Sequence, residues 1–393
     1  MREPIRLAAG LGSLEQPGPP TSPLGFPGPD AVVREVWPDQ AGFDAAVSRE
    51  TEPMAPAATS FDAGVSRETT PGPPIEVTSL DQAAPDAVIP AERALDEATE
   101  PDTPLASEVT RDQWRRQALS TRTFPAPTRT RVMTISNQKG GVGKTTTAVN
   151  LAAALAASGL RTLVVDLDPQ GNASTALGID HRAQVPSVYD VLIDDLPLEQ
   201  VVQTCPDVPL LRCAPATIDL AGAEIELVSL VAREMRLRRA ITTYLDGLEA
   251  QERPHYVLID CPPSLGLLTI NAFVAADEVL IPIQCEYYAL EGLSMLMKNI
   301  ELIKSHLNPG LHVSTVLLTM YDRRTNLAAQ VAEEVIAYFT DKVVKARIPR
   351  SVRISEAPSY GQTVISYDGQ SPGALSYLEA AAEIADRGAA GAF

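Results

Sequence analysis

Beyond residue 130, short apolar runs rich in Val, Ile and Leu alternate with longer segments whose apolar residues recur at three- and four-residue spacing. The short runs predict buried parallel strands, and the longer segments predict helices that connect them. The expected strands are 132–136, 162–166, 210–213, 256–260, 278–283, 314–320 and 343–347, and the clearest expected helices are 145–157 and 220–245. This order predicts an α/β fold with a doubly wound, mostly parallel sheet, in which ligands bind at the carboxyl ends of the strands.

The first 128 residues show neither pattern. They contain 19 of the 33 prolines, few aromatic residues, and 20 acidic residues against 10 arginines and no lysine. Such a segment cannot bury enough apolar surface to offset the entropy lost when the chain becomes ordered. We therefore predict a disordered, acidic, Pro-rich tail over residues 1–128 and one folded domain over residues 129–393, with a short helix over 107–120 just before the domain.

One segment of this tail occurs twice, as F-D-A-A-V-S-R-E-T at residues 43–51 and as F-D-A-G-V-S-R-E-T at residues 61–69. Two explanations are open at this point. The repeat is a short motif that recruits a polar or scaffold protein, or it is the product of replication slippage in an unconstrained linker.

The net charge of the chain is −18, and neither the tail nor the domain is basic. This balance argues against histone-like coating of nucleic acid, although a local basic patch still allows salt-sensitive DNA binding. The cysteines at positions 205, 213, 261 and 285 form no C-x-x-C pair, so the sequence indicates neither a zinc site nor a disulfide framework. No apolar run is long enough to span a membrane, and we expect a soluble cytoplasmic protein without a membrane partner.

A glycine-rich loop, N-Q-K-G-G-V-G-K-T-T-T at residues 137–147, connects the first expected strand to the first expected helix. Its glycines let backbone N–H groups turn inward around a polyphosphate, and the helix N-terminus adds the positive end of its dipole. Lys144 is placed to reach the β- and γ-phosphates, and Thr145 to bind Mg²⁺. The sequence therefore predicts a site for ATP and Mg²⁺. Its expected nucleotide-binding residues are Lys139, Gly140, Gly141, Val142, Gly143, Lys144, Thr145 and Thr146.

The loop departs from the general phosphate-loop pattern, which would have its first glycine at position 138, where this chain has Gln138. The run K-G-G-V-G-K-T at residues 139–145 instead resembles the deviant Walker A motif of the ParA/MinD family. The resemblance implies an ATP-sandwich homodimer in which Lys139 reaches the phosphates of the partner subunit and joins Lys144 in neutralising transition-state charge. A plain surface lysine is the alternative.

Acidic residues end two further expected strands at the same edge of the sheet. The segment V-V-D-L-D-P-Q-G-N at residues 164–172 resembles the family's D-x-D-P-Q-G-N element, which implies that Asp168 orients the attacking water and that Asp166 lies near the metal. A helix cap is the alternative role for one of them. The apolar strand that ends in Asp260 has the form of a Walker B element, so Asp260 is expected to bind Mg²⁺ directly or through water.

Cys261 follows this aspartate directly. The related nitrogenase iron protein holds an iron–sulfur cluster with cysteines from two subunits, but its ligand spacing is missing from this sequence. We therefore expect Cys261 to be a small buried residue.

Resemblance to the ParA/Soj branch extends over residues 131–388. Segments 318–327 and 348–361 are similar to those that carry the DNA-contacting arginines of that branch. They imply Arg324 and Arg353 as first candidates, with Arg323 and Arg350 as weaker neighbours. Arginine suits binding without sequence preference, because its planar fork donates to phosphate oxygens. The alternative is that these arginines pair with surface acids.

The branch implies a partitioning ATPase for a chromosome or a plasmid. ATP-bound dimers would bind double-stranded DNA of the nucleoid without sequence preference, and a ParB-like centromere-binding protein would stimulate an otherwise slow hydrolysis. One alternative, a MinD-like division-site ATPase, requires a basic amphipathic C-terminal helix, whereas residues 374–385 are Ala-rich and followed by no basic face. The other is a scaffold protein that uses ATP only structurally and binds partners through its tail.

Overall fold

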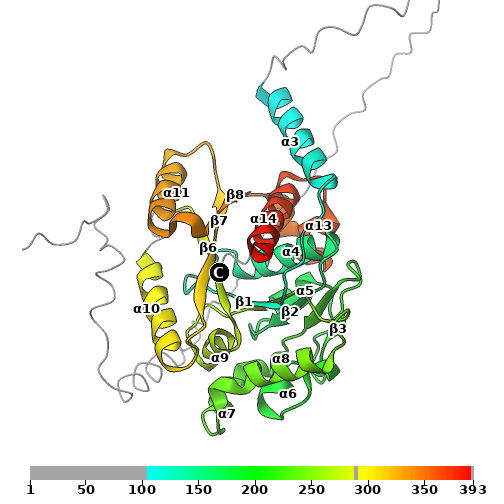
Figure 1. Ribbon diagram of the computed structural model, residues 1–393, viewed down its shortest axis with the longest axis vertical. Coiled ribbons are helices and arrows are strands. Elements are labelled where there is room, and N and C mark those ends of the chain that lie inside the picture. The colour runs from blue at the N-terminus through cyan, green and yellow to red at the C-terminus, as the bar shows by residue number, and fades with distance from the viewer. Residues whose placement is uncertain (1–103, 287–290, 391–393) are drawn as a thin grey trace, which may run out of the picture. The chain divides into compact units, whose positions relative to one another are not determined.

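The computed structural model describes residues 104–286 and 291–390 (Figure 1). Its sheet has eight strands in the order β3-β4-β2-β5-β1-β6-β7-β8. Only the β3–β4 pair is antiparallel. The strands are β1 Arg131–Ile135, β2 Thr162–Asp166, β3 Gln203–Thr204, β4 Leu211–Ala214, β5 Tyr256–Asp260, β6 Glu278–Gln284, β7 His312–Tyr321 and β8 Val343–Pro349. The predicted fold class and all seven predicted strands are confirmed, and only the short edge strand β3 was not expected.

Helices cover both faces of this sheet. The helices are α3 Pro104–Ser120, α4 Lys144–Ala157, α5 Asn172–Ala176, α6 Val188–Ile193, α7 Leu220–Leu227, α8 Arg236–Gly247, α9 Leu267–Ala275, α10 Glu291–His306, α11 Asn326–Phe339, α12 Val352–Glu356, α13 Val364–Tyr367 and α14 Pro372–Ala389. Side chains alternate along each strand, so β5 sends Leu258 into one core with α4 and α14, and Val257 and Ile259 into the other with α8 and α9. The ribbon shows α4 and α14 packed side by side (Figure 1).

One helix prediction was wrong in extent. The segment expected as a single helix over 220–245 forms α7, a 3-10 turn at Arg233–Met235, and α8. Ala232 has φ 52°, a left-handed conformation that interrupts a helix, and Arg236 donates a hydrogen bond to the Ile193 carbonyl (3.2 Å) at the end of α6. Asn271 of α9 donates to the Arg233 carbonyl (2.9 Å). Tertiary contacts therefore fix the break where apolar spacing alone favours continuation.

The entry segment is the helix α3, as expected over 107–120. From Trp114 onward it belongs to the same compact unit as the sheet. Arg115 forms a two-pronged ion pair with Glu379 of α14, with Nε and Nη2 both 2.6 Å from the carboxylate oxygens. The repeated segments 43–51 and 61–69 and most of the predicted tail lie outside the described residues, so the division at residue 128 stays a prediction.

Candidate nucleotide-binding site

The predicted site residues meet at the carboxyl edge of three adjacent strands. Strand β5 lies between β1 and β2, and Asp260 is in register with Ile135 on one side and with Asp166 on the other. The phosphate loop leaves the end of β1 and enters α4 at Lys144. The sheet therefore places the loop beside both aspartates, as the sequence predicts.

Two of the three glycines of the loop adopt backbone conformations in which a residue with a side chain would be strained. Gly141 has φ 73° and Gly143 has φ 86°, both in the left-handed region. The loop is held from outside by the Thr319 hydroxyl, which donates to the Val142 carbonyl (2.9 Å), and by Asn137, which accepts from the Lys139 N–H (3.0 Å). These bonds fix the loop ahead of α4, whose first N–H groups are free of helical partners and form an anion site.

Lys144 lies inside this loop rather than on the surface. Its side chain is buried, and Nζ donates to the Lys139 carbonyl (3.2 Å). Burial lowers the pKa of Lys144, while the charges of Asp260 and Asp168 raise it in part. A buried ammonium that is hydrogen-bonded to a backbone carbonyl can exchange that bond for hydrogen bonds to phosphate oxygens.

Asp260 and Asp166 are both fully buried, but their surroundings differ. Asp166 accepts hydrogen bonds from the N–H (2.9 Å) and hydroxyl (2.7 Å) of Ser174, and burial nevertheless raises its pKa to about 6. Among the described residues neither carboxylate oxygen of Asp260 has a hydrogen-bond partner. Burial, and next the charge of Asp166, raise the pKa of Asp260 well above its ordinary value, whereas the nearby Thr145 hydroxyl and Lys144 lower it.

This set of groups fits Mg²⁺. An unpartnered buried carboxylate beside a threonine hydroxyl offers the oxygen ligands that this cation prefers, and a cation would offset the cost of burying Asp260. The described residues contain no group of three or more His, Cys, Asp or Glu side chains that could hold a metal ion by themselves. Mg²⁺ commonly takes one or two protein ligands and completes its shell with phosphate and water.

Asp168 lies at the rim of the site and is 9% exposed. Its Oδ1 accepts from the Gln170 N–H (3.0 Å), and its own N–H donates to Asp166 Oδ1 (3.2 Å). The turn ends at Gly171, which has φ 63° and precedes α5. One oxygen of Asp168 thus stabilises the turn ahead of α5, while the carboxylate stays close enough to influence Lys144.

The side chain of Lys139 reaches Glu286, which follows β6. Its Nζ lies 3.8 Å from Glu286 Oε2, and Glu286 Oε1 accepts a hydrogen bond from Arg350 Nη2 (3.3 Å). Sequence analysis did not single out Glu286, although its position two residues after β6, at the carboxyl edge, was the signal that it belongs here. One acidic group therefore contacts a lysine expected to act across a dimer and an arginine expected to contact DNA.

The arginines expected to bind DNA follow two neighbouring strands, since Tyr321 of β7 and Pro349 of β8 are in register. Arg323 and Arg324 come after β7, and Arg350 and Arg353 after β8; all are exposed. Arg324 pairs with Asp322 (Nε–Oδ1 3.0 Å), and Arg353 with Glu356 (3.3 Å) and Asp368 (3.5 Å). The pairing with surface acids that was the alternative to DNA binding is thus present, but exposed ion pairs are weak and exchange readily for phosphate.

Cys261 is buried, as predicted. Its Sγ lies 3.0 Å from the Thr134 hydroxyl, and burial raises the pKa of its thiol to about 12. A thiol with so high a pKa stays protonated at neutral pH and is a poor metal ligand.

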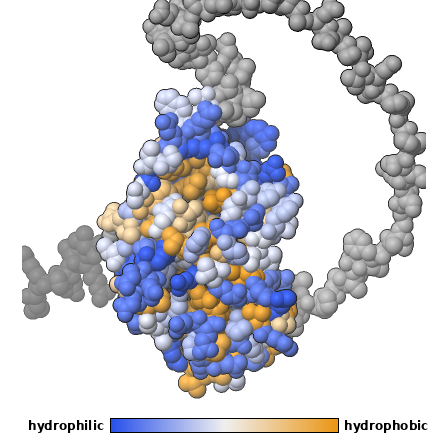
Figure 2. Space-filling view, turned by 90° about the vertical axis from the view of Figure 1, so that its right-hand side faces the viewer, coloured by the Kyte–Doolittle hydropathy of each residue, from blue (hydrophilic) through white to orange (hydrophobic). Residues whose placement is uncertain are grey.

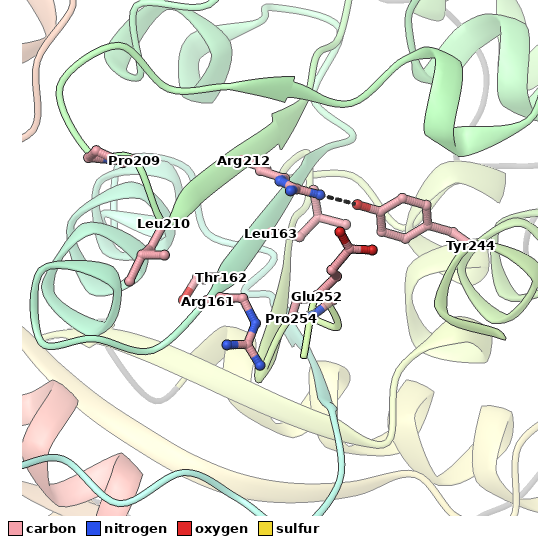
Figure 3. A pocket seen from close by; sticks show the side chains of 9 residues that line it. All are labelled: Arg161, Thr162, Leu163, Pro209, Leu210, Arg212, Tyr244, Glu252 and Pro254. Carbon is pink, nitrogen blue, oxygen red and sulfur yellow. Dashed lines mark hydrogen bonds between the residues drawn. The ribbon is translucent and has the colours of Figure 1, made fainter. Parts of the chain in front are cut away.

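A shallow pocket lies at the opposite edge of the sheet, where strands begin (Figure 3). Arg161 and Thr162 at the start of β2, Leu210 and Arg212 at the start of β4, and Tyr244 of α8 line it. Arg212 Nη1 donates to the Tyr244 hydroxyl (3.3 Å). Because ligands in such sheets bind at the carboxyl edge, this pocket is separate from the phosphate loop.

Comparison with known proteins identifies the family. Residues 130–313 match the model of an AAA domain family. The chain is 55% identical over 258 residues to the sporulation initiation inhibitor protein Soj of Bacillus subtilis, covering 66% of this chain and 99% of Soj. It is 51% identical to the chromosome partitioning protein ParA of Myxococcus xanthus, covering 65% of this chain and 88% of that protein. This chain belongs to the ParA/Soj family of chromosome-partitioning ATPases.

Solved structures agree with the ParA/Soj assignment. A protein described as cobyrinic acid a,c-diamide synthase from Mycobacterium smegmatis, with bound ADP and magnesium, is 36% identical with a TM-score of 0.55 and covers 66% of this chain and 93% of that one. The septum site-determining protein MinD of Pyrococcus horikoshii, complexed with Mg-ADP, is 27% identical with a TM-score of 0.52 and covers 65% and 96%. None of the helices described for this ParA/Soj chain has the length and hydrophobicity needed to cross a membrane.

Proposed function

We propose that this chain is a Mg·ATP-dependent partitioning ATPase that switches between a DNA-bound dimer and a free monomer. The observation that carries the proposal is the buried Asp260 carboxylate, unpartnered among the described residues, beside Thr145 and Lys144 at the end of β5. A protein does not leave such a charge buried without a compensating group unless a ligand supplies one. The ParA/Soj relatives and the nucleotide-bound neighbours support ATP and Mg²⁺ as that ligand.

In this proposal each residue of the nucleotide-binding site has a separate role in phosphoryl transfer to water. Backbone N–H groups of residues 139–146 and the Lys144 ammonium bind the phosphates. Thr145 and Asp260 hold Mg²⁺, which neutralises charge on the phosphates, while Asp166 stays close by and fixes the start of α5. Asp168 orients the water that attacks the γ-phosphorus, and the bond from that phosphorus to the bridging oxygen breaks to release ADP.

The proposed dimerisation depends on the side chain of Lys139. This side chain is 33% exposed and its Nζ is weakly paired with Glu286 at 3.8 Å, so the ammonium is available to the phosphates of a partner subunit. ATP would thus be bound by two subunits at once. Two DNA-binding faces on one dimer then gain affinity from effective concentration, which ties DNA binding to the ATP state.

The four arginines at the ends of β7 and β8 supply the contacts with double-stranded DNA. A ParB-like centromere-binding partner stimulates slow hydrolysis, ADP-bound monomers leave the nucleoid, and a chromosome or plasmid follows the resulting gradient. The acidic tail either weakens DNA binding through charge repulsion or recruits a polar or scaffold protein through its repeated segment. Phosphate contacts of this kind predict binding that weakens steeply with added salt.

Binding to duplex DNA of unrelated sequence tests the proposal. The protein is compared without nucleotide, with ADP, with ATP and with a slowly hydrolysed analogue, as wild type, Arg353→Ala, Arg324→Ala and Lys139→Ala. Arg182→Ala is the matched control, since Arg182 is 86% exposed and pairs with Asp180 two residues earlier, just as Arg324, 88% exposed, pairs with Asp322. We expect ATP-dependent binding that is lost in the three variants and kept in the control.

Binding that ignores the nucleotide, or that persists in Arg353→Ala and Arg324→Ala, would refute the DNA switch. Sedimentation of the ATP-bound protein with anionic lipid vesicles would then favour the MinD-like alternative. Absence of ATP hydrolysis even with DNA and a partner would favour the scaffold.

A further inference from the structure

Glu224 of α7 is an acidic side chain outside the phosphate loop that points toward the start of α9. A methyl group added to Gly266 would lie 1.8 Å from Glu224 Oε1, 2.5 Å from Cδ and 2.7 Å from Oε2. The carboxylate therefore rests directly against the Gly266 backbone. Its neighbours Ala223 and Leu227 are buried in the core, whereas Ile225 is 78% exposed, so α7 turns Glu224 toward the interior side.

Gly266 is the N-cap of α9 and has no side chain to satisfy the first N–H groups of that helix. The Glu224 carboxylate, from another helix, lies at this helix start. Burial raises the pKa of Glu224, and the nearby Leu268 N–H lowers it in part. A carboxylate at a helix N-terminus also meets the positive end of the helix dipole, which favours its charged form. Glu224 Oε1 has no hydrogen-bond partner among the described residues.

Gly266 is close in sequence to Asp260, the carboxylate expected to bind Mg²⁺. Only residues 261–266 separate Asp260 at the end of β5 from α9. This loop is stiff, because Pro262 and Pro263 each fix one backbone angle and the Thr269 hydroxyl donates to the Ser264 carbonyl (2.7 Å). The loop therefore has few freely rotating backbone bonds across which a shift at Gly266 could be absorbed before it reaches Asp260.

We infer that Glu224 is a positioning residue for ATP hydrolysis: by clamping the start of α9 it sets where the loop 261–266 holds Asp260 relative to Thr145. The inference rests on the proposed function, since it assigns a purpose to the position of Asp260. Glu224 itself touches neither Asp260 nor the phosphate loop in any contact of the described residues, and it acts through Gly266 and the loop.

The close approach of Glu224 and Gly266 gives a direct test in the full-length protein. The variants are Glu224→Ala, Glu224→Gln, Gly266→Ala and the Glu224→Ala/Gly266→Ala double variant. Glu226→Gln is the matched control, an exposed acid on the same helix that pairs with the Tyr189 hydroxyl (3.0 Å). Each is assayed for the Mg²⁺ dependence of ATP hydrolysis, for binding of a fluorescent ATP analogue without Mg²⁺, and for hydrogen exchange of residues 261–268 with and without a Mg²⁺-loaded, non-hydrolysable analogue.

We expect Glu224→Ala to raise the Mg²⁺ concentration for half-maximal hydrolysis by about tenfold, the lower range for groups that orient metal ligands, with analogue binding without Mg²⁺ unchanged. Gly266→Ala should have the same effect alone, because its methyl group displaces the carboxylate, but none in the Glu224→Ala background, where the space is free. Glu224→Gln should restore part of the wild-type response, since its amide oxygen keeps an acceptor of the same size near the Leu268 N–H.

Hydrogen exchange tests this inference independently of the proposed function, because the measurement requires no ATP turnover. We expect the Mg²⁺-loaded analogue to protect residues 261–268 in the wild type and in Glu226→Gln but not in Glu224→Ala. The inference would be overturned if Glu224→Ala exchanged faster but kept the wild-type Mg²⁺ dependence and the analogue-induced protection of residues 261–268. Glu224 would then be only a helix cap. A wild type that binds the analogue and protects the loop without hydrolysing ATP would refute the proposed ATPase and leave the clamp standing.

Discussion

Two clusters of buried charge lie at opposite edges of the same sheet, and they are compensated differently. At the amino edge, Arg131 at the start of β1 donates from Nε and Nη2 to both oxygens of Glu278 at the start of β6, at 2.7 and 2.6 Å. Arg131 also donates to the Ile384 carbonyl of α14 (2.9 Å). At the carboxyl edge, Asp260 is equally buried and neither of its oxygens has a partner among the described residues.

The difference in pairing indicates a structural role for Arg131 and Glu278 and a ligand-binding role for Asp260. A fully paired buried charge holds strands and helices in register and needs nothing further. An unpaired one raises the free energy of the empty protein, and that cost falls when a cation binds, so ligand binding and stability become linked. The charged side chains are buried at both edges. Whether such a charge has a partner within the chain decides which edge is expected to bind a ligand.

The largest effect on stability is expected at the amino edge. Arg131→Met leaves the Glu278 carboxylate buried and unpaired, which should lower the free energy of unfolding by about 3–5 kcal/mol. Urea denaturation followed by circular dichroism measures it. Arg131→Met/Glu278→Leu should recover most of the loss, because no charge is then left without a partner. A double variant as unstable as the single one would contradict the role assigned to this pair.

At the carboxyl edge the largest effect should be on catalysis rather than on folding. Asp168→Asn should slow phosphate release by about 100-fold, since an amide orients and polarises the attacking water poorly. ATP-dependent DNA binding should persist, because hydrolysis is what ends it. Asp180→Asn, at an exposed acid outside the site, is the control. Normal turnover in Asp168→Asn would move the catalytic role to another residue.

Asp260→Asn should show the opposite sign of stability change from Arg131→Met. An amide costs less to bury than an unpaired carboxylate, so the nucleotide-free protein should gain about 1 kcal/mol in its free energy of unfolding. The rise in Tm on adding Mg²⁺ with ATP should shrink, since the variant has lost a ligand. Thermal unfolding with and without Mg·ATP measures both. A clearly destabilised variant would show that Asp260 has a structural role after all.

The smallest effect concerns pH. Burial raises the pKa of Glu278, but its hydrogen bonds and charge contact with Arg131 outweigh burial and leave that pKa below its ordinary value of 4.5. A depressed folded-state pKa contributes stability above pH 4.5 that is lost as pH falls through the folded-state value. Urea unfolding at pH 5.5 and pH 3.5 should therefore show a larger loss for the wild type than for Arg131→Met/Glu278→Leu. Equal losses in the two proteins would exclude this source of acid sensitivity.

Sequence by itself determined the parts of this protein that local pattern controls. Apolar runs located every strand of the parallel sheet, and the glycine spacing around Lys144 identified the phosphate loop, because the turn needs glycine whatever surrounds it. Asp166, Asp168 and Asp260 were found because they follow buried strands, whose carboxyl ends meet in any sheet of this class. The roles of these residues and of the four arginines rest on resemblance to the ParA/Soj family.

The tertiary structure alone decided what depends on residues far apart in the chain. It broke the helix expected over 220–245 at Ala232, because Arg236 and Asn271 bond to distant backbone there. It placed Glu286 between Lys139 and Arg350, set Glu224 against Gly266, and left Asp260 without a partner among the described residues. A residue's pattern along the chain predicts its element and its burial, whereas compensation of its charge depends on which side chains the fold brings beside it.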